Sequence, residues 1–176
     1  MRYFRIKPYD VLSRVAGRPL TTPKECNVCR QIIRSGETDL RVQFVDPPPY
    51  PDVLGVLFGP EWVVTPGLMR VICKFEPLTH FAQVSDVNNN PLDYFQVIVN
   101  SFINISKKSI RSGKPCPECG CGAQMNLNHI YVELGQGLSP ALARIFEAKS
   151  VYVAREDLAE EMDKNFDIDI EEVHCN

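Results

Sequence analysis

The sequence lacks the features that mark several large classes of protein. No window approaches the run of about 18 apolar residues that a transmembrane helix requires. The first ten residues contain Arg2, Arg5 and Lys7 and have no apolar core of the kind found in a secretory signal peptide. The chain has 19 Lys and Arg against 22 Asp and Glu, so the basic excess typical of nucleic-acid-binding proteins is missing. We therefore expect a cytoplasmic protein with neither a membrane nor nucleic acid as its main partner.

Recognisable catalytic motifs are missing as well. The chain has no HExxH pair, no phosphate-binding Gly-Lys-Ser/Thr loop, no GxSxG turn and no Gly-rich dinucleotide turn. Half of the zinc-deaminase signature is present at Pro115-Cys116-Pro117-Glu118-Cys119. However, His80-Phe81-Ala82 lacks the glutamate that would transfer protons. The sequence therefore predicts a protein that is not an enzyme.

What the chain does have is the composition of an ordinary globular protein. It contains 176 residues, of which 44% are hydrophobic and 23% are charged. A chain of this length can bury a full core without covalent cross-links. We expect one domain over residues 1–176, of the α+β class.

Two segments of the chain share a strand-helix-strand pattern. Residues 62–84 begin with an apolar run, and Thr65-Pro66 then indicates the start of a helix. Leu68, Met69, Ile72 and Cys73 follow at helical spacing, so we expect Cys73 in the core. Residues 151–173 begin with another apolar run and continue into a polar helix and an alternating strand. These patterns predict two β-α-β-like modules around mixed or antiparallel sheets, although any strand-helix-strand segment would match so loosely.

The seven cysteines carry the strongest chemical signal. Five of them lie in two short clusters, which is typical of metal binding rather than of a disulfide framework. A CxxC turn presents two thiolates, and two such turns supply the four sulfurs that suit a tetrahedral structural zinc ion. The sequence therefore predicts a zinc-ribbon-like site with the ligands Cys26, Cys29, Cys116 and Cys119.

The ligand set leaves alternatives open. Arg30 stands where a glycine would relieve the first CxxC turn. Cys121 makes the second cluster CxxCxC, so Cys121 or His129 could replace one of the four ligands. Other readings are two unrelated thiol pairs, a site that has lost its metal, and a redox-active CxxC pair.

These motifs resemble the double-CXXCG motif family of bacterial immunity proteins, which are found beside polymorphic toxins. The chain has an early CxxC, then Phe58-Gly59-Pro60 ahead of the Trp62-Val63-Val64-Thr65 strand, a later CPxCG, and a final strand-helix-strand module. The first motif departs from the family pattern at Arg30. The resemblance implies a cytoplasmic protein without enzymatic activity that binds and neutralises one cognate toxin.

Charge patterning suggests where a partner could bind. Acidic residues concentrate near the end of the chain, which is either a solvated surface or one complementary to a basic toxin. The residues that we expect to contact the toxin are Glu156, Asp157, Glu160, Glu161 and Asp163. The alternative function is that of a zinc-ribbon module which binds nucleic acid or associates with transcription. That alternative depends on a basic stretch before the second CxxC, formed by Lys107, Lys108, Arg111 and Lys114.

Overall fold

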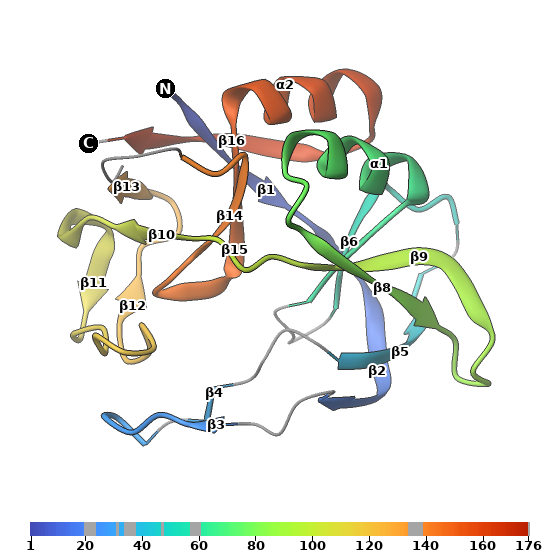
Figure 1. The fold of residues 1–176 in the computed structure, drawn as a ribbon, viewed down its shortest axis with the longest axis horizontal. Coiled ribbons are helices and arrows are strands. Elements are labelled where there is room, and N and C mark those ends of the chain that lie inside the picture. Colours follow the sequence, from blue (N-terminus) through green and yellow to red (C-terminus); the bar gives the residue numbers. More distant parts are fainter. Residues whose placement is uncertain are drawn as a thin grey trace.

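The computed structural model describes residues 1–19, 24–30, 32–33, 38–46, 48–56, 61–133 and 139–175. These residues form sixteen strands, two α-helices and one 3-10 turn (Figure 1). The fold class is α+β, as the sequence predicts. The protein is nevertheless mostly β, and its larger mixed sheets close into barrels.

The two halves of the chain repeat one order of elements. In each half, two strands precede a short hairpin, three strands follow it, and a helix and a last strand complete the half. The first half contains β1 (Tyr3–Lys7), β2 (Tyr9–Pro19), the hairpin strands β3 (Lys24–Glu25) and β4 (Ile32–Ile33), β5 (Thr38–Phe44), β6 (Val53–Val56), β7 (Trp62–Val64), α1 (Pro66–Phe75) and β8 (His80–Ser85). The second half contains β9 (Pro91–Ile98), β10 (Phe102–Ile105), the 3-10 turn η1 (Lys107–Ser109), the hairpin strands β11 (Ile110–Ser112) and β12 (Gln124–Met125), β13 (Tyr131–Glu133), β14 (Leu142–Ile145), β15 (Ala148–Arg155), α2 (Glu156–Asn165) and β16 (Asp169–Cys175).

Each half builds a six-stranded barrel, and the halves exchange their first strands. The barrel of the first half has the strand order β2-β5-β8-β9-β7-β6, and that of the second half has β1-β15-β14-β10-β13-β16. Strand β9 therefore completes the first barrel and β1 the second. The pattern of parallel and antiparallel pairs is the same in both, with β5–β8 and β2–β6 parallel in one and β13–β16 and β10–β14 parallel in the other. The two barrels therefore have the same topology.

The two predicted β-α-β-like modules are present, with one difference. Strands β7 and β8 flank α1, and β15 and β16 flank α2, as expected. The two strands of each module do not pair with each other. Instead, β9 lies between β7 and β8 and is antiparallel to both, and β1 lies in the same way between β15 and β16. The inserted strand comes from the other half, so it could not be assigned from the local pattern.

Among the described residues, three apolar cores lie within and between the barrels. One fills the first barrel and includes Leu12, Val42 and Val63, and a second fills the other barrel. The third lies between the barrels and the helices and includes Leu68 and Leu158, both fully buried. The helices α1 and α2 contact each other and lie side by side over this shared core (Figure 1).

The contacts between the two halves also come in equivalent pairs, with corresponding segments of each half in contact with the other half. The rings of Trp62 and Tyr152 stack with centroids 3.9 Å apart, and each ring comes from the strand just before a helix. Glu76, after α1, accepts a hydrogen bond from the backbone N–H of Ala141 at 2.8 Å. The carbonyl of Asp167, after α2, accepts one from the N–H of Asp52 at 3.2 Å. Each half thus ties the segment after its helix to the other half.

Some local predictions need correction. Helix α1 starts at Pro66, but the Thr65 hydroxyl makes no capping bond and donates to Asp52 at 2.6 Å instead. Cys73 is exposed rather than in the core, because the buried face of α1 centres on Leu68 and Ile72. The segment Phe58-Gly59-Pro60 lies outside the described residues.

Candidate metal centre

The two short hairpins, β3–β4 and β11–β12, bring four cysteines together. Cys26 and Cys29 lie between β3 and β4, and Cys116 and Cys119 lie between β11 and β12. The four sulfur atoms all lie within 4.8 Å of one another, so they are close enough to bind one metal ion. The hairpins are inserted at the same place in each half, and each half therefore supplies two of the four sulfurs.

The spacing of the sulfurs fits a tetrahedral ion. Four Zn–S bonds of about 2.3 Å place neighbouring sulfurs about 3.8 Å apart. The sulfurs of Cys26 and Cys116 are 3.8 Å apart, and those of Cys29 and Cys119 are 3.4 Å apart. Three of the four residues are buried and Cys29 is half-buried, so water has little access to the group. Such a set can hold a metal ion as a structural cross-link, and tetrahedral thiolate ligation suits zinc or iron.

The two CxxC turns have the same backbone geometry despite their different sequences. The N–H of Arg30 donates to the carbonyl of Cys26 at 2.9 Å, and the N–H of Gly120 donates to that of Cys116 at 2.8 Å. Arg30 has a φ of 62° and Gly120 a φ of 73°. Arg30 thus adopts the left-handed conformation that favours glycine, and the missing glycine does not disrupt the first turn.

Gly120 is required for a second reason. A Cβ atom at this position would lie 2.2 Å from the carbonyl oxygen of Phe146 and 2.8 Å from its carbonyl carbon. Phe146 belongs to the turn between β14 and β15, so the second CxxC turn packs directly against the backbone of the barrel. No side chain fits into this contact unless the backbone moves.

The thiols of the group differ in their acidity. The backbone N–H groups of Cys29 and Val28 donate to the Cys26 sulfur and lower its pKa to about 7. Burial raises the pKa of Cys119. A bound dication stabilises the thiolate form of all its ligands, and metal affinity is therefore expected to rise with pH.

The two alternative ligands lie outside the group of four. Cys121 is half-buried and packs against the cluster, and its thiol lies 3.8 Å from the carbonyl oxygen of Cys119. His129 is exposed in the turn between β12 and β13. The other thiols, Cys73 and Cys175, are not members of the group either.

The acidic residues expected to contact a toxin divide into two sets. Glu156 forms an ion pair with Arg2, and Asp157 accepts two hydrogen bonds from Arg155 at 2.7 and 2.8 Å. Within the described part of the chain, Glu160, Glu161 and Asp163 form no ion pair. Glu160 and Asp163 are exposed, and Glu161 is half-buried.

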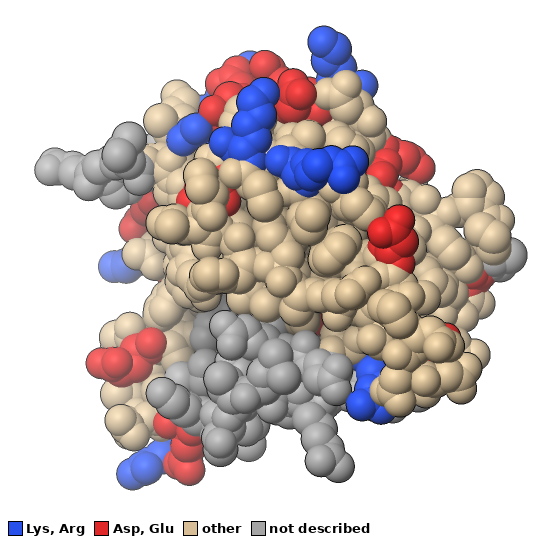
Figure 2. All heavy atoms as spheres, turned by 45° about the vertical axis from the view of Figure 1, so that its right-hand side comes forward, with Lys and Arg blue, Asp and Glu red and all other residues tan. Residues whose placement is uncertain are grey.

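The charge on β16 is also largely compensated. Its acidic side chains face the basic residues of β1, with Lys7 3.1 Å from Glu171 and Arg5 3.8 Å from the same carboxylate. On the face that Figure 2 displays, Lys and Arg side chains lie beside Asp and Glu side chains at the end where the helices lie. The exposed face of α2 is therefore the main acidic surface left without partners among the described residues.

Sequence reasoning missed the equivalence of the two CxxC turns, although a signal was present. Cys26 and Cys116 are 90 residues apart, and so are Cys29 and Cys119. Tyr3-Phe4-Arg5-Ile6 of β1 matches Tyr94-Phe95-Gln96-Val97 of β9 at nearly the same offset. A comparison of the chain with itself would have found both.

Neither helix of the described residues is long and apolar enough to cross a lipid bilayer. Comparison of the chain with protein-family models gave no match, and neither did comparison with curated proteins. The assignment of a function therefore depends on the site and on the sequence motifs.

Proposed function

We propose that this chain is a non-enzymatic, cytoplasmic immunity protein that binds and neutralises one cognate bacterial toxin, with a structural zinc ion joining its two halves. The observation that carries the zinc role is the closed group of four sulfurs, two from each half. Four thiolates complete the shell of zinc and leave no position for a substrate, so such an ion stabilises rather than catalyses.

The toxin-neutralising role is supported by the resemblance of the CxxC and CPxCG motifs to the double-CXXCG family. The proposed contact surface is the exposed face of α2, with Glu160, Glu161 and Asp163 as its charged residues. These three carboxylates have no ion-pair partner among the described residues and are free to meet a basic surface. Glu156 and Asp157 lie at its edge, where Arg2 and Arg155 partly neutralise them. Complementary charge of this kind mainly accelerates association.

The test of the toxin role is protection of cells. We expect a large toxin gene directly upstream of this one; its product is expressed with and without the protein, and survival is measured. We expect the protein to restore growth and to bind the purified toxin. Growth arrest that the protein does not relieve would contradict the proposal.

The proposed surface has its own test. Charge reversal at Glu160, Glu161 and Asp163 should slow association with the toxin by about tenfold at low salt, and the difference should shrink as salt rises. The matched control reverses the charges at Asp169, Glu171 and Glu172, which already pair with β1. An unchanged association rate at low salt would exclude the α2 surface but would leave the zinc site unaffected.

A further inference from the structure

A groove of about 860 Å³ lies between the second CxxC hairpin and the end of the second barrel. One wall consists of the segment from β10 to the second CxxC turn, and the other includes Glu133 and the Phe146-Glu147 turn. Its accessible apolar lining includes Ile110 and Phe146, whereas Ile105 belongs to the buried core of the second barrel. The volume lies within the range of pockets that bind ligands of drug size or the anchoring part of a peptide.

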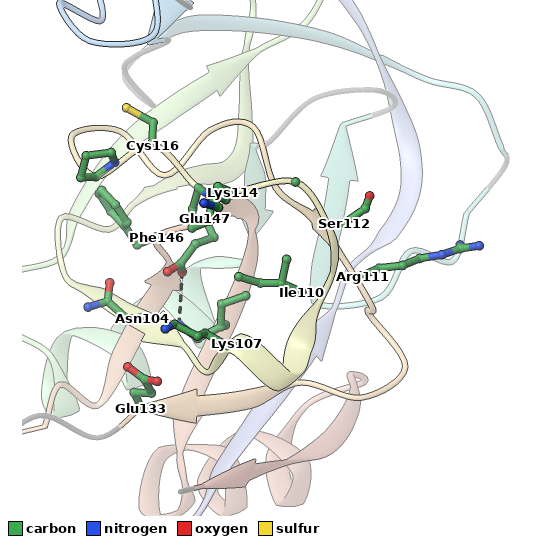
Figure 3. A pocket seen from close by; sticks show the side chains of 14 residues that line it. Asn104, Lys107, Ile110, Arg111, Ser112, Lys114, Cys116, Glu133, Phe146 and Glu147 are labelled. Carbon is green, nitrogen blue, oxygen red and sulfur yellow. Dashed lines mark hydrogen bonds between the residues drawn. The ribbon is translucent and has the colours of Figure 1, made fainter.

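The basic residues of this groove have no acidic partner among the residues that the structure describes. Lys107, Arg111 and Lys114 are all exposed, and none forms an ion pair with any described residue. Lys107 and Lys114 lie among the groove side chains, and Arg111 extends outward at the rim (Figure 3). By contrast, all three basic residues of the N-terminal segment, Arg2, Arg5 and Lys7, pair with carboxylates. Unpaired cations beside a hollow, in a chain of net charge −3, indicate a negatively charged occupant.

The two carboxylates of the groove restrict the kind of occupant. Glu147 accepts a hydrogen bond from the backbone N–H of Ile105 at 3.2 Å, and burial raises its pKa. Glu133 is exposed on the facing wall. An occupant must therefore offer acidic groups to the lysines and hydrogen-bond donors to the glutamates. An extended peptide does both, because its backbone N–H groups are donors. The backbone of a nucleic acid carries a phosphate at every step and would meet both carboxylates unfavourably.

One aromatic ring near the groove, that of Tyr131, is already engaged within the chain. Lys108 lies over the ring of Tyr131 at 5.6 Å, and His174 stacks on the same ring with centroids 4.7 Å apart. Phe102 meets Phe146 edge-on at 6.0 Å. The ring of Tyr131 is thus engaged within the chain, whereas single-stranded nucleic acids need free ring faces for stacking.

We propose that this groove binds an acidic, extended segment of a partner protein, with Lys107 and Lys114 pairing its carboxylates and Ile110 and Phe146 packing against its apolar side chains. This docking surface is separate from the α2 face and does not depend on the toxin-neutralising role. A partner that offers apolar side chains between acidic ones fits both the lining and the charge.

The test uses the full-length, metal-loaded protein and three fluorescein-labelled probes. The first is a dodecapeptide in which Glu and Leu alternate, the second is the same peptide with Lys for Glu, and the third is a single-stranded oligothymidylate of twelve nucleotides. Fluorescence anisotropy should show saturable binding of the acidic peptide only. The affinity should fall by about tenfold in Lys107→Glu/Lys114→Glu and should weaken with salt. The matched control, Arg70→Glu/Lys74→Glu, makes the same charge change at two exposed positions of α1 and should shift the affinity by less than about twofold.

Several results would overturn the proposal. These are no binding of the acidic peptide, equal losses in the groove and control variants, and tighter binding of the oligothymidylate, which would assign the groove to nucleic acid. Hydrogen exchange on the unaltered protein gives a second measurement that does not depend on the folding of a variant. The acidic peptide should slow exchange at residues 104–117, and protection confined to other segments would also refute the assignment.

Discussion

Replacing Gly120 by alanine should destabilise the protein, whereas alanine at the equivalent Arg30 should not. A left-handed φ costs an L-residue about 1–2 kcal/mol relative to glycine. The added Cβ would also lie 2.2 Å from the carbonyl oxygen of Phe146, and relieving a contact of this kind costs about 1–3 kcal/mol. Reduced freedom of the unfolded chain offsets about 0.4–1 kcal/mol. The expected net loss is about 3 kcal/mol, which corresponds to a fall in melting temperature of about 6–12 °C for a chain of this length.

The measurement is thermal unfolding of metal-loaded protein, followed by circular dichroism, with the metal content determined in parallel. Arg30 already has a Cβ and a φ of 62°. Arg30→Ala therefore loses only the exposed ion pair with Glu25 at 3.4 Å, worth about 0–1 kcal/mol. Arg30→Gly should be neutral or stabilising, because it removes the left-handed penalty. A Gly120→Ala variant that melts within about 2 °C of the unaltered protein would refute the reasoning, since it would mean that the second turn does not pack against Phe146.

Further predictions concern the metal, the shared core and pH. Purified protein should contain about one zinc per chain. Cys116→Ser should lose the zinc and melt at a lower temperature, whereas Cys121→Ser should keep the zinc. A metal-free Cys121→Ser protein would show that Cys121 is a ligand. Leu158→Ala should lower the free energy of unfolding, measured in urea, by about 2–5 kcal/mol because Leu158 is fully buried in the shared core. Cys73→Ser alters an exposed side chain and should lower it by less than about 0.5 kcal/mol. Hydrogen bonds from Arg155 hold the pKa of Asp157 below its ordinary 3.8. The pair therefore stabilises the fold at pH values above 3.8, and this contribution is lost as the pH falls through the lower, folded-state pKa. The stability difference between the unaltered protein and Asp157→Asn should accordingly shrink below about pH 4, and a difference that stays constant from neutral pH to pH 2 would show that the pair contributes nothing.

Local patterns were enough to locate most of the elements near the helices. The proline at position 66 and the spacing of Leu68 and Ile72 indicate α1 because both effects act within one or two helical turns. The same logic failed for Cys73. Helical spacing from another apolar residue does not settle which side of the helix faces the core, and only the packing of α1 against β9 and α2 decides that.

The four-cysteine group was also predictable from sequence, because CxxC turns present their thiols wherever they occur. The departure at Arg30 left the geometry of the first turn open. In the structure, Arg30 has a φ of 62° and its N–H donates to the carbonyl of Cys26, so the first turn forms without a glycine. Neither feature follows from the residue type alone. The same holds for the position of Cys121 outside the group of four, which depends on how the hairpin packs and not on its spacing.

The sequence by itself determined the α+β class, the two strand-helix-strand segments and the identity of the clustered thiols, because each depends on residues close together in the chain. Only the tertiary structure decided that the halves exchange β1 and β9, that both form closed barrels, and that Trp62 meets Tyr152 between the two halves. It also decided which carboxylates are already neutralised, since Glu156 lies 154 residues from its partner Arg2. Pairing between distant strands and side chains depends on the burial of the shared core, to which both halves contribute, and no local pattern carries that information.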